Sequence, residues 1–393
     1  MSEKRKQRIE RLYAEGKYGK YREEKFKNGD YYDVVSYVTN FDKGFDKAPF
    51  TDGDSLVLCQ LAYTNIHLFA GKKLREIPSL IKDEKEVAPY CGEDCMRLIK
   101  AMEKSVRFGD IVVLDGETKV SEEEQCQYGV LLFDCGDFLY TACRGTDDHL
   151  IGWFEDIDLI YKEELVSHRY TVNALNRYGA TYDKPFIVGG HSKGGNIAVY
   201  ASAFCNPEIS ERIIAVYDHD GPGFLPSVAE REEMRKIFPK VDKTCPELSV
   251  FGIMMREKEL TLRTVYSHNN GIYQHYIMNW QIEKNDGTLV LAEKNNRASR
   301  VVNGVVDEVL PKMTYDDRVC FRTFCVSIMG KANIASLDDI SFLAVLKVVG
   351  AMFSEPIKRQ GYMWKLLGMV IASVFRNEKR VRREIRREKN SNR

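Results

Sequence analysis

The sequence lacks several features that would assign it to a common class of protein. Its 58 Lys and Arg residues balance 58 Asp and Glu residues, so no net charge favours nucleic acid or a membrane. It has no uninterrupted run of about 18 apolar residues, the length that a membrane-spanning helix needs. Residues 366–375 come closest and are too few. We therefore expect no spanning helix.

Export and metal-binding signals are also missing. Residues 1–27 are charged and contain no apolar core of a secretory signal. Ten cysteines are scattered along the chain, and only Cys91 and Cys95 stand close together. Neither a second pair nor a histidine lies nearby at ligand spacing, so we predict no metal site. Scattered cysteines in a long chain without an export signal favour a cytoplasmic protein with reduced, mostly buried thiols.

The hydrophobic pattern indicates alternating strands and helices. Residues 54–70 and 93–105 carry apolar residues at helical spacing, and from about residue 300 the pattern is again helical. Short β-prone runs occupy residues 128–133, 138–143, 186–188, 213–217, 248–255 and 260–266. Helical segments at 169–181 and 196–204 lie between them. Continuous apolar strands that alternate with helices predict a mostly parallel sheet covered on both faces.

A G-x-S-x-G motif stands between one of these strands and the helix that follows. Gly190 and Gly194 flank Ser192, directly after the strand at 186–188. A sharp turn there needs small residues, and the start of the helix points N–H groups at a developing negative charge. We predict that Ser192 is a nucleophile. The alternatives are an ordinary glycine-rich turn or a phosphate-binding loop.

A nucleophilic serine needs a general base and a carboxylate that orients the base. In proteins with a serine turn of this kind, called a nucleophile elbow, the carboxylate comes next in the chain and the histidine base after it. His219, His268 and His275 are the histidines that follow Ser192. We favour His275, which lies late among aromatic residues, and keep His268 as the alternative. His219 ends the next strand beside Asp220, where the acid is usually found.

The acid and the oxyanion hole follow from the ends of strands. Asp220 begins a turn after the buried strand at 213–217, at the edge of the sheet where sites assemble, so we predict that it orients the base. A later glutamate, Glu247, Glu257 or Glu259, is the alternative. Thr146, in the loop after an earlier strand, and Lys193 are predicted to supply the oxyanion-hole N–H groups.

These motifs resemble the Mbeg1-like family of bacterial α/β-hydrolases, which is distantly similar to class 3 lipases. The similar blocks are residues 49–63, 144–156 (beginning RGTDD), 190–195 (GHSKGG), 220–224 (DGPGF) and 274–280. The resemblance covers about residues 30–285. Where the family has an Asp after the histidine this sequence has Tyr276, and because His275 is retained the change does not remove the base.

The resemblance implies an α/β-hydrolase fold, with a mostly parallel central sheet, helices on both faces and additional N- and C-terminal helices. It implies a serine hydrolase of carboxylic esters, lipase- or esterase-like, that uses Ser192, His275 and Asp220 and needs no cofactor or metal. The substrate would be a small-molecule ester or a lipid, and no nucleic-acid partner is expected. The alternative is a non-catalytic binding protein on the same fold, because fold alone does not give function.

The pattern divides the chain into four parts. We expect a charged lead-in at 1–27, a hydrolase domain at 28–300 with a candidate lid at 225–245, a helical region at 301–375 and a basic tail at 376–393. The tail holds nine Lys and Arg residues against three Glu, and follows an apolar stretch at 362–375. That combination favours peripheral contact with the inner face of a membrane, and a core helix with a solvated tail is the alternative.

Overall fold

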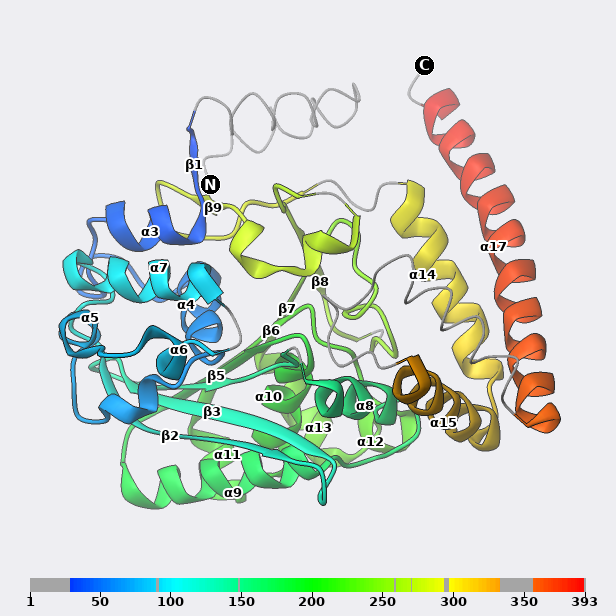
Figure 1. Ribbon diagram of the computed structural model, residues 1–393. Coiled ribbons are helices and arrows are strands. Elements are labelled where there is room, and N and C mark those ends of the chain that lie inside the picture. The colour runs from blue at the N-terminus through cyan, green and yellow to red at the C-terminus, as the bar shows by residue number, and fades with distance from the viewer. Residues whose placement is uncertain are drawn as a thin grey trace.

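The computed structural model describes residues 29–89, 92–147, 149–257, 259–269, 271–292, 297–332 and 356–391. The lead-in predicted at 1–27 lies outside these residues. Figure 1 shows the chain coloured along its length, with the central sheet between two groups of helices.

The central sheet has seven strands in the order in which they occur along the chain. They are β2 (Val112–Ser121), β3 (Cys126–Asp134), β4 (Leu139–Cys143), β5 (Phe186–His191), β6 (Ile213–His219), β7 (Val241–Pro246) and β8 (Leu262–Val265). β2, β3 and β4 pair antiparallel, whereas every pair from β4 to β8 is parallel. The predicted mostly parallel sheet is therefore confirmed.

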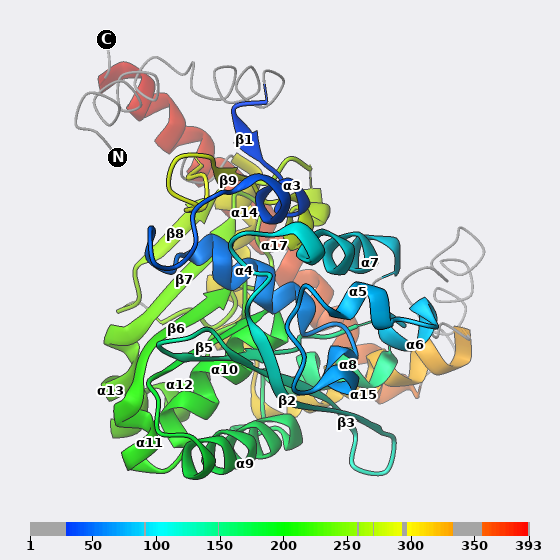
Figure 2. The same ribbon diagram turned by 90° about the vertical axis from the view of Figure 1, so that its left-hand side faces the viewer.

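Alternating side chains of β3 divide the core into two layers. Leu131 and Phe133 pack with the N-terminal helices α3 (Val34–Asn40), α4 (Asp52–Leu61) and α7 (Gly92–Ala101). Val130 and Leu132 pack with α9 (Val166–Thr181), α10 (Lys193–Phe204), α11 (Pro207–Arg212) and α13 (Glu232–Ile237). Because successive side chains of a strand point to opposite faces, helices cover both faces of the sheet, as Figures 1 and 2 show.

The remaining elements of the hydrolase domain are short. They are β1 (Tyr31–Tyr32), η1 (Ile66–Phe69), α5 (Ile77–Leu80), α6 (Glu84–Val87), η2 (Met102–Lys104), α8 (Leu150–Asp158), α12 (Pro226–Ala229), η3 (Phe238–Lys240), η4 (Gly271–His275), η5 (Ile277–Asn279) and β9 (Ile282–Glu283). β1 and β9 pair antiparallel in a separate two-stranded sheet. The prediction of a strand at 248–255 is wrong, because residues 247–255 form bends and turns.

The segment 225–245, a candidate lid from its sequence, contributes some of its side chains to the core. Met234, Ile237 and Phe238 are buried in the cluster that also contains residues of α10. The last five residues of the segment belong to β7, which is hydrogen-bonded to β6 and β8. Helix residues 226, 227, 232, 233, 235 and 236 of the segment are exposed. A lid within 225–245 stays a prediction.

The C-terminal region is helical. It contains α14 (Arg297–Val309), η6 (Leu310–Lys312), α15 (Tyr315–Ala332) and α17 (Ile357–Ser391). α17 runs through the boundary expected at 375, so in the described part the basic stretch continues the same helix. In Figure 1 α17 stands at the outer edge, with α14 between it and the sheet. No helix among the described residues is long and apolar enough to cross a membrane.

The cysteines differ from the sequence expectation at one position. Six described cysteines are free and buried, as expected: Cys59, Cys126, Cys135, Cys143, Cys205 and Cys245. Cys95 is disulfide-bonded, so the expectation of reduced thiols does not hold there.

Candidate active site

Ser192 occupies a sharp turn between β5 and α10. Its backbone has φ 59° and ψ −133°, a conformation that residues with a side chain rarely adopt. A Cβ at Gly190 would collide with the Gly194 carbonyl, and one at Gly194 would collide with the Cys143 carbonyl. Both glycines of the motif are therefore required by close backbone approach.

The structure brings His275 and Asp220 together across 55 residues of sequence. His275 Nδ1 lies 2.6 Å from Asp220 Oδ2. The other carboxylate oxygen, Oδ1, accepts the Ser249 hydroxyl and the Gly252 N–H, the latter at 3.2 Å. An ionised carboxylate can only accept hydrogen bonds, so this pair is formed when His275 donates from Nδ1, and Nε2 is then the nitrogen that can accept a proton. This is the tautomer that a general base needs.

Two aromatic rings hold the imidazole of His275. The His191 and Phe251 rings each lie with their centroid 4.5 Å from that of His275. His191 Nε2 donates to the His275 carbonyl at 2.9 Å, and its Nδ1 accepts from the Tyr63 hydroxyl at 3.0 Å. Burial, together with the neighbouring His275, holds the pKa of His191 well below its usual value, so this ring stays neutral and keeps its tautomer.

Ser192 and His275, the predicted nucleophile and base, are not in direct hydrogen-bond contact. Among the described residues Ser192 Oγ and His275 form no hydrogen bond. Ser192 is 8% exposed, and His191, next to it in the chain, stacks on His275. In enzymes without substrate such contacts are often long and tighten only when substrate binds.

The loop predicted to form the oxyanion hole lies against the nucleophile. A Cβ placed on Gly145 would be 3.2 Å from Ser192 Cβ, which brings the backbone beside Thr146 close to the elbow. The Thr146 hydroxyl donates to Asp156 Oδ2 at 2.7 Å. Burial raises the pKa of Asp156 to about 6. Thr146 is therefore held by a buried carboxylate whose pKa lies above its usual value.

Lys193 can contribute to this site only through its backbone. Its side chain is buried, with Nζ 2.6 Å from Glu155 Oε2 and 3.0 Å from the Gln127 carbonyl. The residue is the first of α10, where N–H groups lack partners within the helix. The ion pair with Glu155 ties the start of α10 to α8, which also carries Asp156.

The alternative residues lie in other surroundings. His219 is buried, with Nε2 2.9 Å from Ser55 Oγ and Nδ1 2.8 Å from Thr244 Oγ1, and burial lowers its pKa to about 3. His268 is exposed. Of the later glutamates, Glu257 is buried and accepts the Phe224 N–H at 2.7 Å, whereas Glu259 is exposed.

Sequence reasoning missed the residues that support Asp220. Ser249 and Gly252 lie in a segment whose apolar pattern predicted a strand. Beside them Lys243 Nζ, which is buried, pairs with Asp218 and also binds the Gly221 carbonyl, fixing the turn that carries Asp220. A lysine at a buried strand position is the signal that could have revealed this pair, because such a charge needs a partner.

A metal has no evident place here. Within the described ranges, no group of three or more His, Cys, Asp or Glu side chains is arranged to hold a metal ion.

The sheet and the elbow together define the class. A mostly parallel sheet with a serine turn between β5 and α10, an acid after the next strand and a later histidine constitute an α/β-hydrolase fold. The profile of the Mbeg1-like family matches residues 102–323, more than half of the chain. The protein belongs to this family.

Three solved structures are similar to this chain, and the titles of two of them name a lipase. M37 lipase has 13% identity and a TM-score of 0.35, over 58% of this chain and 79% of its own. A mutant form of MDLA from Penicillium cyclopium has 10% identity and a TM-score of 0.36, over 62% and 85%. The Rhizomucor miehei lipase–propeptide complex has 12% identity and a TM-score of 0.32, over 55% and 67%. No curated protein sequence matches the chain.

Proposed function

We propose that the protein is a serine hydrolase that cleaves carboxylic esters, lipase- or esterase-like, with Ser192, His275 and Asp220 as its triad. The observation that carries the proposal is the 2.6 Å pair of His275 and Asp220, with its partners, beside a serine in a strained turn. A strained nucleophile and a base held in one tautomer have little use outside covalent catalysis.

The reaction begins at the acyl carbonyl. Ser192 Oγ attacks the carbonyl carbon while its proton passes to His275 Nε2, and Asp220 stabilises the imidazolium. The backbone N–H groups of Thr146 and Lys193 stabilise the oxyanion. The C–O bond of the ester then breaks, and His275 gives its proton to the leaving alcohol. Water, deprotonated by His275, attacks the acyl-enzyme, and the acid leaves as Ser192 regains its proton.

The proposed substrate is a small-molecule ester or a lipid, and no cofactor enters the reaction because the triad supplies its own acid–base chemistry. The lipase titles of the similar structures suggest the lipid-like choice. A lipid-like substrate calls for contact with a lipid surface, and the C-terminal helix with its basic end is the part of the chain that we propose for it. The cytoplasmic location predicted from the sequence remains a prediction.

A second reading is a binding protein on a hydrolase fold. It is favoured by the missing hydrogen bond between Ser192 and His275 among the described residues, and by the small exposed fraction of Ser192. In that case the serine would not be activated, and the fold would only hold an ester-like ligand.

Active-site labelling separates the two. The purified protein and Ser192→Ala are treated with a fluorophosphonate, and intact mass is measured. We expect one adduct on the native protein, none on Ser192→Ala, and slow labelling of His275→Gln. A p-nitrophenyl ester series then gives the preferred acyl length. Absence of an adduct with both this probe and a smaller sulfonyl fluoride, in a protein that is folded by circular dichroism, would refute the hydrolase proposal.

A further inference from the structure

The outward side of α17 carries a row of exposed apolar side chains. Trp364 is 53% exposed and Phe375 is 72% exposed, and between them lie Leu367, Ile371 and Val374, all at least 40% exposed. Residues three or four apart share one side of a helix, so these five side chains form a continuous stripe. We call this set the α17 stripe.

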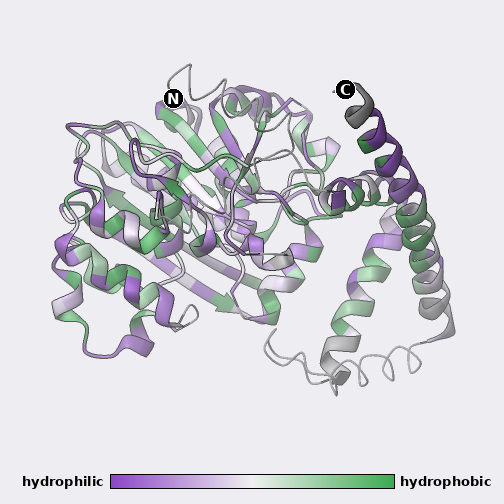
Figure 3. Cartoon of the chain, turned by 90° about the horizontal axis from the view of Figure 1, so that it is seen from above, coloured by the Kyte–Doolittle hydropathy of each residue, from purple (hydrophilic) through white to green (hydrophobic). Residues whose placement is uncertain are grey.

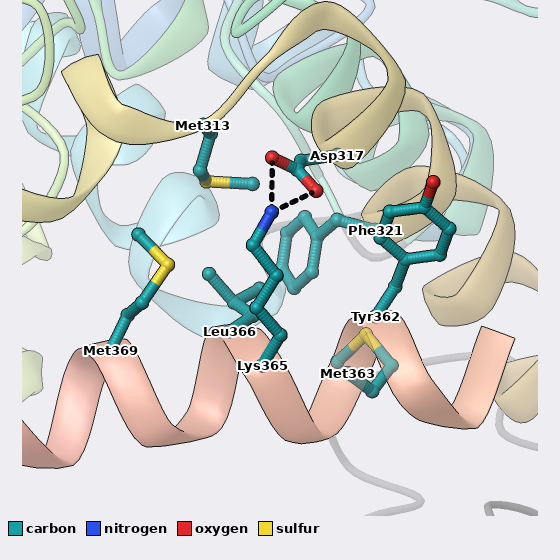
Figure 4. Close-up of a pocket in the computed structure, with 8 residues that line it drawn as sticks. All are labelled: Met313, Asp317, Phe321, Tyr362, Met363, Lys365, Leu366 and Met369. Carbon is teal, nitrogen blue, oxygen red and sulfur yellow. Dashed lines mark hydrogen bonds and ion pairs between the residues drawn. The ribbon is translucent and has the colours of Figure 1, made fainter. Parts of the chain in front are cut away.

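The opposite side of the same helix is attached to the protein. Figure 4 shows Lys365, Leu366 and Met369 directed toward α15 and the residues before it, with Lys365 Nζ 3.1 Å from both carboxylate oxygens of Asp317. One turn further on, Ser373 is buried and donates to Glu308 of α14 at 2.6 Å. Because the inner side is fixed by ion pairs and packing, the α17 stripe must face outward.

Basic side chains continue along α17 beyond the stripe. Four of them are exposed and form no ion pair among the described residues: Lys379, Arg383, Arg386 and Arg387. Other arginines of this stretch have partners, such as Arg376 with Glu308 and Arg382 with Glu378. Figure 3 shows the change along the helix, from mixed green and purple turns to purple turns near the C-terminus. We call the four unpaired residues the α17 cations.

We propose that α17 is a docking helix for an anionic lipid bilayer. The α17 stripe enters the boundary between headgroups and acyl chains, and the α17 cations bind lipid phosphates. With 35 residues the helix is about 50 Å long, and of the α17 cations Lys379 and Arg386, four and eleven residues after Phe375, lie on the side of the stripe and can meet the same flat surface. The charge of the helix favours an anionic bilayer, because unpaired cations beside an apolar stripe attract an anionic partner. A second copy of the chain would bring the same cations to the contact, and like charges repel.

Vesicle sedimentation tests this docking. The full chain carrying Ser192→Ala, which leaves the lipid intact, is mixed with vesicles of phosphatidylcholine alone or of phosphatidylcholine with about 30% of the anionic lipid phosphatidylglycerol. We expect binding to the anionic vesicles, at least about tenfold weaker binding to the neutral ones, and release by high salt. Because no catalysis is needed, the result is independent of whether the protein hydrolyses esters.

Matched variants locate the surface. Leu367, Ile371 and Val374 are replaced together by Gln, and the control replaces Leu68, Val106 and Ile214, which are exposed residues of the same three types outside α17. In a second pair of variants, one neutralises the α17 cations and the control neutralises four lysines that are exposed and form no ion pair among the described residues: Lys47, Lys72, Lys82 and Lys104. We expect each α17 set to weaken binding more than about tenfold, and each control set to change it less than about threefold.

Tryptophan fluorescence distinguishes a lipid bilayer on the α17 stripe from a second copy of the chain. Trp280 is buried and Trp153 is partly buried, so a blue shift on adding anionic vesicles reports Trp364, and Trp364→Phe should abolish it. The proposal is overturned if anionic vesicles do not bind the folded protein, or if the control sets weaken binding as much as the α17 sets. It is also overturned if light scattering shows a dimer that the stripe variant dissociates, while vesicles leave Trp364 emission unchanged.

Discussion

Replacing Ser192 by glycine measures the strain in the turn between β5 and α10. A residue with a side chain at φ 59° and ψ −133° is expected to cost about 1–3 kcal/mol, because its Cβ crowds the neighbouring backbone. Ser192→Ala keeps that cost and Ser192→Gly removes it. The step from alanine to glycine at this position therefore isolates the strain.

The expected difference follows from three terms. Relief of strain stabilises the glycine variant by about 2 kcal/mol. Glycine loses about 0.7 kcal/mol through the greater freedom of its unfolded chain, and about 0.8 kcal/mol through the buried methyl group that it lacks. Ser192→Gly should thus be as stable as Ser192→Ala, or more stable by about 0.5 kcal/mol.

Urea unfolding of both variants provides the measurement, with Ala198→Gly as the control. Ala198 is fully buried in the unstrained interior of α10, so glycine there should cost about 1.5–2 kcal/mol. If the alanine-to-glycine step at 192 is as destabilising as the step at 198, the turn stores no strain and the reasoning fails. Both Ser192 variants lack the hydroxyl, so neither should react with a fluorophosphonate, and their stability can be compared apart from catalysis.

Three further perturbations test the surroundings of the site. Asp220→Asn should lower kcat for a p-nitrophenyl ester about 10⁴-fold, because an amide favours the wrong tautomer of His275; a fall of less than tenfold would place the acid elsewhere. His168 is buried, and desolvation lowers its pKa to about 3. Between about pH 3 and the unfolded pKa of about 6.5 the unfolded state therefore binds one more proton than the folded state. The free energy of unfolding should then decrease by about 1.4 kcal/mol for each pH unit that the pH falls. His168→Asn should remove that slope when urea unfolding is compared at pH 7 and pH 5, and an unchanged slope would contradict a neutral buried ring. Lys243→Met should lower the free energy of unfolding by about 3–5 kcal/mol in the same assay, because it leaves Asp218 buried without a counter-charge. Adding Asp218→Leu to Lys243→Met should restore at least half of that loss. Equal losses in the single and the double variant would mean that the pair acts by packing alone.

Much of the fold could be read from local patterns. The antiparallel β3 and β4, the later parallel strands and the helices between them follow from hydrophobic period, which depends only on near neighbours in sequence. The turn at Ser192 was predictable for the same reason. Its two glycines lie within two residues of the serine, and their need for space is a local property of the backbone.

The errors concern segments whose role depends on distant partners. Residues 248–255 have the apolar character of a strand, yet Ser249 and Gly252 bind Asp220, which lies 29 and 32 residues earlier. Residues 225–245 are polar enough to suggest a lid, which stays a prediction, and the sequence did not show that Met234, Ile237 and Phe238 pack in the core beside α10. Neither set of contacts can be inferred from the composition of the segment, because the residues that it contacts lie elsewhere in the sequence.

The sequence by itself determined the order of the strands and helices, the elbow and a short set of candidate acids and bases. Only the tertiary structure decided which of these meet. It brings His275 to Asp220 and holds the ring between His191 and Phe251, whereas His268, only seven residues away, is exposed. It also made the basic stretch after residue 375 a helix with an outer and an inner side, since Ser373 and Asn377 bind Glu308 of α14. The physical reason is the same in both cases: a side chain's partner is set by packing between elements far apart in the chain, which no local pattern contains.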